Sequence, residues 1–202
     1  MVSCYLCVYS KSMEAFFSTI EKLIVLDSAS RQAFAAIMQY HEFPKGHLLV
    51  KPGTVCHSIF FIEEGLTRTY YEKDGKDITD WLSPENSFAC SIVSFITRRP
   101  DRRGIEALEL TRAWTIHYND LETLYTTHHS IERMGRLIVS SGLVQLQMRF
   151  DDLHFATAAE RYATMMKQTP SLLQRTPLHI IASYLGITQE TLSRIRAQHI
   201  LL

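Results

Sequence analysis

Residues 178–196 read LHIIASYLGITQETLSRIR, and the order of residue types in this stretch predicts two short helices joined by a tight turn. Gly186 stands where such a turn needs a positive φ, and Ala182 is small where the two helices would cross. The apolar residues that would form the shared buried face are Ile181, Leu185, Ile187, Leu192 and Ile195. Pro177 suits the first turn of the first helix, and Thr188 suits the cap of the second. The stretch therefore predicts a helix-turn-helix.

The second of these helices is predicted to expose a largely polar face, opposite Leu192 and Ile195. The positions on that face are Gln189, Glu190, Ser193, Arg194 and Ala197. Polar and basic side chains of this kind reach base edges and phosphates in the major groove of DNA. The alternative is a helical hairpin that only packs, but such a hairpin has no need of this face. The residues expected to contact DNA are Thr188, Gln189, Glu190, Ser193, Arg194 and Arg196.

The composition of the whole chain agrees with a folded protein whose charge is local. Its 202 residues are 46% hydrophobic and 21% charged, which excludes a disordered or fibrous chain and allows one large or two small cores. The chain has 21 Lys and Arg residues and 21 Asp and Glu residues. The chain as a whole is therefore not a polybasic protein that coats nucleic acid or membrane. Residues 156–202 nevertheless carry five basic and two acidic side chains, a net charge of +3. This end is the candidate nucleic-acid end.

Residues 41–118 follow a different pattern, in which short β-branched and aromatic runs alternate with Gly, Pro, Asp and Asn. The runs predicted as strands are residues 48–50, 58–62, 66–71, 78–82 and 114–118. Turns are predicted at Gly46, Gly53, Gly65 and Gly75. Asp74-Gly75 is the strongest hairpin signal, because Gly tolerates the positive φ of a tight primed turn. Strands of this length and spacing predict a sandwich or a barrel.

Helices are predicted on both sides of the strand-rich region. Apolar residues recur at three and four positions over residues 13–40, which fits two helices broken at Asp27-Ser28. One of these two residues would cap the second helix. Near the C-terminus a helix is expected at 156–167, followed by a break at Thr169-Pro170 and a short helical piece at 172–173.

A long helical stretch follows from Leu121, and it carries an apolar seam. The seam consists of Ile131, Met134, Ile138, Leu143, Leu146 and Phe150. It is longer than its own domain needs. We therefore expect Met134, Ile138 and Leu146 to form a dimer interface with a second copy of the chain, as in a short coiled coil.

From residue 13 onward these features together resemble the Crp/Fnr superfamily of bacterial transcription regulators. The most specific segments are residues 187–195, ITQETLSRI, which resemble the family's recognition helix, and residues 60–65, FFIEEG, which resemble a β-roll turn. The resemblance implies an α+β fold. Its parts are an N-terminal β-roll, which is a jelly-roll-like double-stranded β-helix flanked by helices, a long dimerisation helix and a C-terminal all-α helix-turn-helix domain.

The expected division of the chain follows from the resemblance. Residues 1–12 are interpreted as a start extension, 13–125 as a cyclic-nucleotide-binding-like sensor domain, 126–153 as the dimerisation helix and 154–202 as the DNA-binding domain. Since the given sequence ends at Leu202, the β-hairpin wing that follows the recognition helix in many members is not expected.

The resemblance also implies partners and roles. Gln189, Glu190 and Arg194 match the positions that read bases; Glu190 and Arg194 have the family's usual residue type, whereas Gln189 replaces an Arg. The expected partners are double-stranded DNA with a pseudo-palindromic operator and a second copy of the chain. RNA polymerase is a further candidate partner. The operator sequence stays open.

The sensor pocket departs from the family pattern. Nucleotide-binding members hold the ribose and cyclic phosphate with a Gly-Glu-Leu turn and a later Arg followed by Ser or Thr, whereas the corresponding residues here are 88–90, FAC, and 102–104, RRG. Loss of the ribose-binding carboxylate costs about 1 to 3 kcal/mol, so cyclic AMP is not expected. Any effector is expected in a small, apolar cavity facing the long helix. The residues expected to line it are Trp81, Phe88, Ala89, Cys90, Ser91, Ser94, Arg102 and Arg103.

The cysteines and histidines give little support to a metal site. Cys4 and Cys7 form a C-x-x-C, but an iron–sulfur cluster needs about four thiolates, and Cys56 and Cys90 lie in separate β segments, where they are best interpreted as buried or incidental. The nine histidines include no pair at ligand spacing, and neighbouring His128-His129 point to different faces of a helix. We expect no metal and no cofactor.

Several other functions lack their sequence signature. No apolar run approaches the roughly 20 residues that cross a bilayer, and residues 1–10 lack the positive region of a secretory signal, so a cytoplasmic protein is expected. G-x-S-x-G, P-loop and G-x-G-x-x-G motifs are absent, so we expect no enzyme and no catalytic residue. The main hypothesis is a homodimeric DNA-binding regulator, and the alternative is a sensor module that acts through a protein partner without specific DNA binding. An enzyme that uses the β-roll cavity has only the shape of the fold in its favour.

Overall fold

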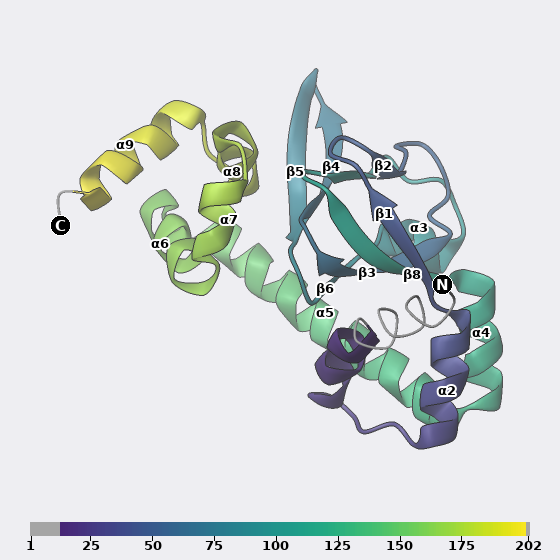
Figure 1. Ribbon diagram of the computed structural model, residues 1–202. Coiled ribbons are helices and arrows are strands. Elements are labelled where there is room, and N and C mark those ends of the chain that lie inside the picture. The colour runs from purple at the N-terminus through teal and green to yellow at the C-terminus, as the bar shows by residue number, and fades with distance from the viewer. Residues whose placement is uncertain (1–12, 201–202) are drawn as a thin grey trace, which may run out of the picture.

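The computed structural model describes residues 13–200 and consists of a helical N-terminal segment, a β sandwich, one long helix and a C-terminal group of helices (Figure 1). Residues 1–12, with Cys4, Cys7 and the proposed start extension, lie outside the described residues. Within the described part, none of the helices is long and apolar enough to cross a membrane.

The N-terminal segment contains a helix at residues 13–21 and α2 (Ser28–Ile37). The predicted cap of the second helix is confirmed at Asp27, whose carboxylate accepts hydrogen bonds from the Ser30 N–H at 2.8 Å and the Ser30 hydroxyl at 2.7 Å. These bonds lower the pKa of Asp27 to about 2. The helical stripe predicted to reach Tyr40 ends earlier, because Tyr40 pairs with Trp114 in a sheet.

Within residues 13–200, eight strands form two four-stranded antiparallel sheets. The first has the order β1-β8-β3-β6 and the second the order β2-β7-β4-β5. The strands are β1 (Gln39–Phe43), β2 (Leu48–Val50), β3 (Ser58–Glu64), β4 (Thr67–Lys73), β5 (Lys76–Ser83), β6 (Ser87–Ala89), β7 (Gly104–Ala107) and β8 (Thr111–His117). A short helix, α3 (Ile92–Thr97), stands between β6 and β7. This is the sandwich predicted from the alternating pattern.

The predicted strands are confirmed with shifted ends, and three strands were not predicted. Leu66 precedes β4 instead of starting it, and Tyr118 begins a helix instead of ending β8. The unpredicted strands β1, β6 and β7 are short and exist only through pairing with distant partners. The hairpin between β4 and β5 turns at Asp74 and Gly75, which have φ values of 55° and 72°. Positive φ at both positions is the geometry of a primed turn, so the predicted hairpin is confirmed.

One hydrophobic core lies between the sheets and continues into the helices below them. Phe61 and Trp114 are fully buried in the sandwich, and Phe16 joins them from the helix at residues 13–21 with its ring stacked on Phe34 at 5.1 Å. The same core receives α4 (Tyr118–Thr127) and the first turns of α5 (His129–Phe155), where Ile131 has no exposed surface. The sensor domain and the start of the long helix therefore share one core.

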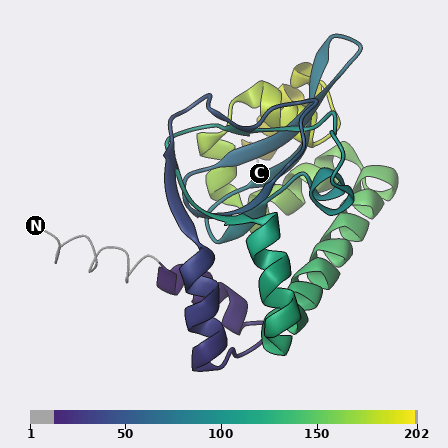
Figure 2. The same cartoon turned by 90° about the vertical axis from the view of Figure 1, so that its right-hand side faces the viewer.

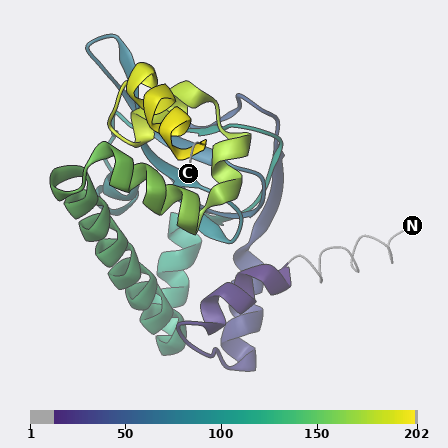
Figure 3. The same ribbon diagram turned by 90° about the vertical axis from the view of Figure 1, so that its left-hand side faces the viewer.

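The C-terminal helices are α6 (Ala158–Gln168), α7 (Pro170–Arg175), α8 (Leu178–Tyr184) and α9 (Gln189–Ile200). Thr157 and Glu160 form a capping box, which explains why α6 starts after residue 156 and not at it. The predicted break is confirmed at Thr169, which ends α6, and Pro170 opens α7. Figure 3 shows these helices gathered against one side of the sandwich.

A second hydrophobic core joins these helices to the β-roll. Its β-roll members are Leu66, Leu82 and Leu108, and its helical members are Tyr162, Met165, Leu172, Ile180, Ile181, Ala182, Leu185, Leu192 and Ile195. All of them are buried, so the helical domain and the sandwich are packed directly on each other. The position of the C-terminal helices thus depends on the surface that the β-roll presents.

Candidate nucleic-acid interface and sensor site

Helices α8 and α9 are joined by residues 185–188, as the sequence predicts for a helix-turn-helix. Gly186 has a φ of +67°, and the Ile187 N–H donates to the Ala182 carbonyl at 3.0 Å to close the turn. Ala182 is 2% exposed at the helix crossing. One detail differs, because Pro177 is the N-cap of α8 and not part of its first turn.

Helix α9 has one buried and one exposed face. Leu192 has no exposed surface and Ile195 is 7% exposed, so both lie in the second core. The six residues predicted to contact DNA, Thr188, Gln189, Glu190, Ser193, Arg194 and Arg196, are all exposed. Figure 1 shows α9 on the outside of the helical group, away from the sandwich. The structure brings the predicted polar residues onto one accessible helix.

The start of α9 is fixed by its own side chains. The Thr188 hydroxyl accepts a hydrogen bond from the Thr191 N–H at 3.2 Å, which confirms Thr188 as the cap. A hydrogen bond with the Thr188 side chain lowers the pKa of Glu190, and the positive charge of Arg194 acts in the same direction. Among the described residues, no intramolecular ion pair engages Arg194 or Arg196. Both guanidinium groups are therefore available to an outside partner.

The apolar seam of α5 differs from the predicted dimer interface. Met134 is 1% exposed in the core, so the prediction that it faces a partner is wrong. Ile138 is only partly buried against the same core, and its place in an interface stays a prediction. The first turns of α5 pack their apolar face against the sandwich. Leu146, by contrast, is 56% exposed, as a partner contact requires.

The exposed apolar residues of α5 begin further along the helix. Val139, Leu143, Leu146, Phe150 and Leu153 are between 40% and 66% exposed, and we call them the α5 stripe. They follow one another at intervals of four, three, four and three residues, which is the spacing of a coiled-coil seam. Figure 2 shows α5 along the outer edge of the molecule.

The residues predicted to line a ligand pocket are scattered over different environments. Trp81 lies on β5 of the second sheet, whereas Phe88 and Ala89 lie on β6 of the first. The Phe88 ring packs on Phe61 at 5.4 Å and Phe16 at 6.2 Å, in the core that also receives the start of α5. Its place in a ligand pocket stays a prediction.

The polar members of the predicted pocket are satisfied within the chain. Buried Ser94 accepts a hydrogen bond from the Cys56 N–H at 2.9 Å and donates to the Arg99 carbonyl at 2.6 Å. Arg103 binds Asp80 at 2.6 Å, and Arg102 lies over the Tyr71 ring at 4.6 Å. Arg103 is therefore paired within the chain, whereas Arg102 is exposed.

Asp101 is the residue that sequence reasoning missed. Its carboxylate accepts a hydrogen bond from the Ser91 hydroxyl at 2.8 Å and lies 3.4 Å from Arg103. Burial opposes ionisation, but the Ser91 hydrogen bond and the Arg103 charge hold the pKa of Asp101 below its usual value. The only sequence signal was an acidic residue next to two arginines. Its negative charge lies beside Ser91 and Arg103, two of the residues predicted to line the ligand pocket.

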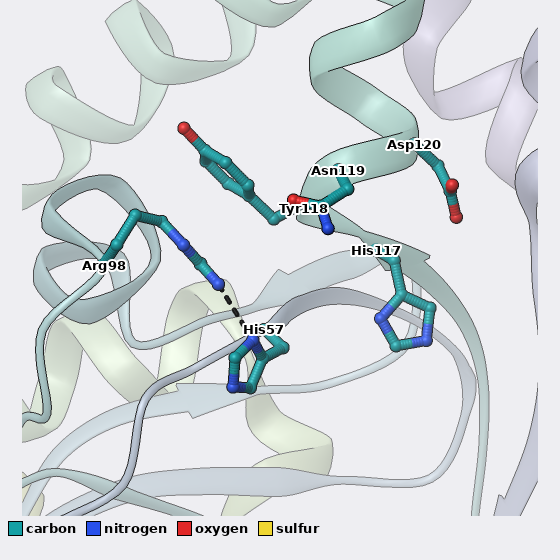
Figure 4. Close-up of a pocket in the computed structure, with 6 residues that line it drawn as sticks. All are labelled: His57, Arg98, His117, Tyr118, Asn119 and Asp120. Carbon is teal, nitrogen blue, oxygen red and sulfur yellow. Dashed lines mark hydrogen bonds between the residues drawn. The ribbon is translucent and has the colours of Figure 1, made fainter.

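Two shallow pockets of the described surface contain none of the residues predicted to line the ligand pocket. The first, of about 210 Å³, is lined by His57, Arg98, His117, Tyr118, Asn119 and Asp120 (Figure 4). The guanidinium of Arg98 in this pocket already donates a hydrogen bond to the Cys56 carbonyl at 2.9 Å and contacts Nδ1 of His57 at 2.9 Å. The second, of about 260 Å³, runs along β2 and the start of β3. Within residues 13–200 there is no group of side chains placed to hold a metal ion.

Comparison with known proteins identifies the domain of the sandwich and the overall fold. Residues 40–128 match the cyclic nucleotide-binding domain family. FixK2 from Bradyrhizobium japonicum superimposes with a TM-score of 0.68 at 18% identity, over 80% of this chain and 84% of that chain. A putative Crp/Fnr regulator from Eubacterium rectale also gives 0.68, at 16% identity, over 87% and 84%. This chain shares the fold of these two structures.

A third solved structure has a similar fold. The catabolite activator protein of Thermus thermophilus gives a TM-score of 0.54 at 18% identity, over 86% of this chain and 83% of that chain. A search of curated proteins finds no match. The Crp/Fnr resemblance and the fold class predicted from the sequence are thereby confirmed. At these identities the likeness establishes the fold, and the function has to be argued from the residues.

Proposed function

We propose that this chain is a homodimeric, sequence-specific DNA-binding transcription regulator of the Crp/Fnr type. The observation that carries the proposal is the division of α9 into a buried apolar face and an exposed polar face with two unpaired arginines. A hairpin that only packed would not keep Arg194 and Arg196 free. The structural neighbours, which include transcription regulators, support the same function.

In the proposed complex α9 lies in the major groove. Arg194, from the middle of the exposed face, reads a base edge, since a guanidinium binds the O6 and N7 atoms of guanine with two hydrogen bonds. Arg196 contacts the phosphate backbone, and Gln189 and Glu190 contribute further base contacts from the N-terminal end of the helix. Thr188 and Ser193 add shorter polar contacts.

The α5 stripe is the proposed dimer interface. Five exposed apolar residues at coiled-coil spacing on one helix are costly in water and pair well with an identical helix. A two-fold axis along this stripe would present two copies of α9 to successive major grooves, about 34 Å apart. A pseudo-palindromic operator follows from that geometry.

The contacts between the two domains offer a route by which the sensor would set the position of α9. The Ser183 hydroxyl of α8 accepts the Thr79 N–H of β5 at 2.8 Å. Arg149 of α5 donates to the Asp80 carbonyl at 3.1 Å and to the Tyr184 carbonyl at 2.7 Å. Arg149 therefore connects the proposed dimer helix by hydrogen bonds to both the sensor and the DNA-binding domain. A shift of β5 would move both.

The same domains are also joined by an ion-pair cluster. Arg175 of α7 binds Glu85, on the β5–β6 turn, at 2.6 Å, and it also binds Glu109, before β8. Glu85 in turn accepts the Gly65 N–H at 3.1 Å. A ligand shifts a conformational equilibrium only by the difference in its affinity for the two conformations. An effector of this protein would therefore have to change these hydrogen bonds and ion pairs between the sensor and the DNA-binding domain.

The sensor is proposed not to bind cyclic AMP. The ribose-binding carboxylate is missing at residues 88–90, and Asp101 places a negative charge against Ser91 and Arg103, where it would repel a cyclic phosphate. The identity of an effector stays open. We further propose that the protein is not an enzyme and works in the cytoplasm, where its DNA target would be found.

Selection of bound sequences from random duplex DNA tests this function. The proposal predicts enrichment of a two-fold-symmetric site by the parent chain and weaker enrichment of that site by the variant Arg194→Ala. Gln198→Ala is a matched control, because Gln198 is an exposed residue of α9 outside the predicted contact set. Absence of enrichment by the parent chain would contradict the proposal and favour a sensor module that acts through a protein partner.

A further inference from the structure

Two cysteines of the sensor domain, Cys56 and Cys90, lie together in the structure although 34 positions separate them in the sequence. Cys56 stands just before β3 and Cys90 just after β6, and these strands are antiparallel neighbours in which Phe60 pairs with Ala89. The pairing brings both cysteines to the same end of the two strands. Both side chains pack against the core of the sandwich, where the two thiols interact and the Cys56 sulfur also lies 3.2 Å from the Ser58 carbonyl oxygen.

The surroundings of the pair favour a thiolate on Cys56. The hydrogen bond from the Cys90 thiol, the Ser91 N–H and the positive charge of Arg98 lower the pKa of Cys56 to about 7. The same hydrogen bond, given by Cys90, and burial raise the pKa of Cys90. One thiolate and one thiol in contact are the starting state for disulfide formation.

We propose that Cys56 and Cys90 are a redox-reactive dithiol that hydrogen peroxide oxidises to a disulfide. Cys56 has no exposed surface and Cys90 is half-buried. This burial suits an oxidant close to water in size and disfavours a bulky one such as a peptide disulfide. The proposal does not depend on DNA binding.

The chemistry balances in two steps. The Cys56 thiolate attacks one peroxide oxygen, so that a sulfur–oxygen bond forms, the oxygen–oxygen bond breaks and hydroxide leaves, taking a proton to become water. Cys90 then attacks the Cys56 sulfur; the sulfur–sulfur bond forms, and the second hydroxide leaves with the Cys90 proton as water. The two sulfurs lose two electrons and the peroxide gains them. A dithiol reductant reverses the change.

The disulfide would act on α3, because both cysteines are attached to its ends. The Cys56 N–H donates to Ser94 of α3 at 2.9 Å, and the Cys56 carbonyl accepts from Arg98, the residue after α3, at 2.9 Å. Cys90 directly precedes Ser91, the N-cap of α3. Arg98 also lines the pocket of Figure 4. Oxidation would therefore shift the backbone at both ends of this helix, at Ser91 and at Arg98.

The test is peptide mapping of the full chain with Cys4→Ser and Cys7→Ser, after graded hydrogen peroxide and quenching with an alkylating reagent. The expected result is one Cys56–Cys90 linked peptide from folded protein, which dithiothreitol removes. Glutathione in the same tube reports that the peroxide was active. If glutathione is oxidised while Cys56 and Cys90 are both alkylated, or if the link forms only in denaturant, the proposal is overturned.

Two single variants test the order of the steps. In Cys90→Ser the sulfenic acid has no partner, so the trapping reagent dimedone should label Cys56. In the parent protein the disulfide forms instead, and the dimedone signal should fall at least about tenfold. Labelling of Cys90 in a Cys56→Ser protein, at the level of Cys56 in the first variant, would overturn the assignment of Cys56 as the attacking thiolate. Circular dichroism before peroxide treatment checks that both variants are folded.

Discussion

Replacing Leu143 with Glu should break the proposed dimer without unfolding the chain. Leu143 is 66% exposed, so its side chain contributes little to the fold of one chain. Burial of a whole Leu side chain is worth about 1.5 to 3 kcal/mol, and two thirds of that amount is about 1 to 2 kcal/mol for each chain. A two-fold dimer loses it twice, about 2 to 4 kcal/mol, which weakens association about 30- to 700-fold. Two like charges across the axis add to this.

Light scattering at several protein concentrations measures the effect. The parent chain should give twice the monomer mass of 23.3 kDa, and Leu143→Glu should give the monomer mass with an unchanged circular dichroism spectrum. Gln145→Glu is the matched control, because it adds the same charge about 200° round α5. If Leu143→Glu stays dimeric, or the parent chain is monomeric throughout, the α5 stripe is not the dimer interface.

Three further predictions concern DNA, ligand and pH. Arg194→Ala should weaken binding to the selected operator by about 1 to 3 kcal/mol, and equal operator affinity of this variant and the parent would contradict the base-reading role. Arg196→Ala should weaken binding to all DNA sequences alike and reduce the slope of log affinity against log salt concentration by about one. Calorimetry with cyclic AMP and cyclic GMP should show no binding, and micromolar binding that changes operator affinity would overturn the role given to Asp101. Asp27 has its pKa lowered from 3.8 to about 2 by the Ser30 bonds, so its stabilisation is present above pH 3.8 and is lost as the pH falls through 2. The melting temperatures of the parent and Asp27→Ala should therefore converge on acidification, and parallel curves would exclude this cap as the cause.

The helix-turn-helix could be predicted in detail because its constraints are local. A positive φ at Gly186, a cap at Thr188 and an apolar contact at Leu192 each depend on residues a few positions away. The Asp74-Gly75 hairpin was predictable for the same reason. Strands β6 and β7 were not, because their residues, SFA and GIEA, form no continuous apolar run like Leu48–Val50, and their pairing partners are far away in the sequence.

The facing of side chains was the less predictable part of the candidate site. Met134 has the spacing of a seam residue, but whether it meets its own sandwich or a partner depends on where α5 crosses the β-roll. Phe88 turns toward Phe16 because the helix at residues 13–21 covers that end of the sheet. Asp101 and the Cys56–Cys90 contact likewise result from tertiary packing, which no local pattern records.

The most direct test of a dimer that reads DNA through two copies of α9 is operator spacing. The affinity of the parent chain for its selected symmetric site should be compared with that for a site carrying about five extra base pairs between the half-sites, half a turn of DNA. The account predicts that binding to the extended site falls to that of a single half-site, because the second α9 would face the wrong side of the duplex. Equal affinity for both sites would contradict it.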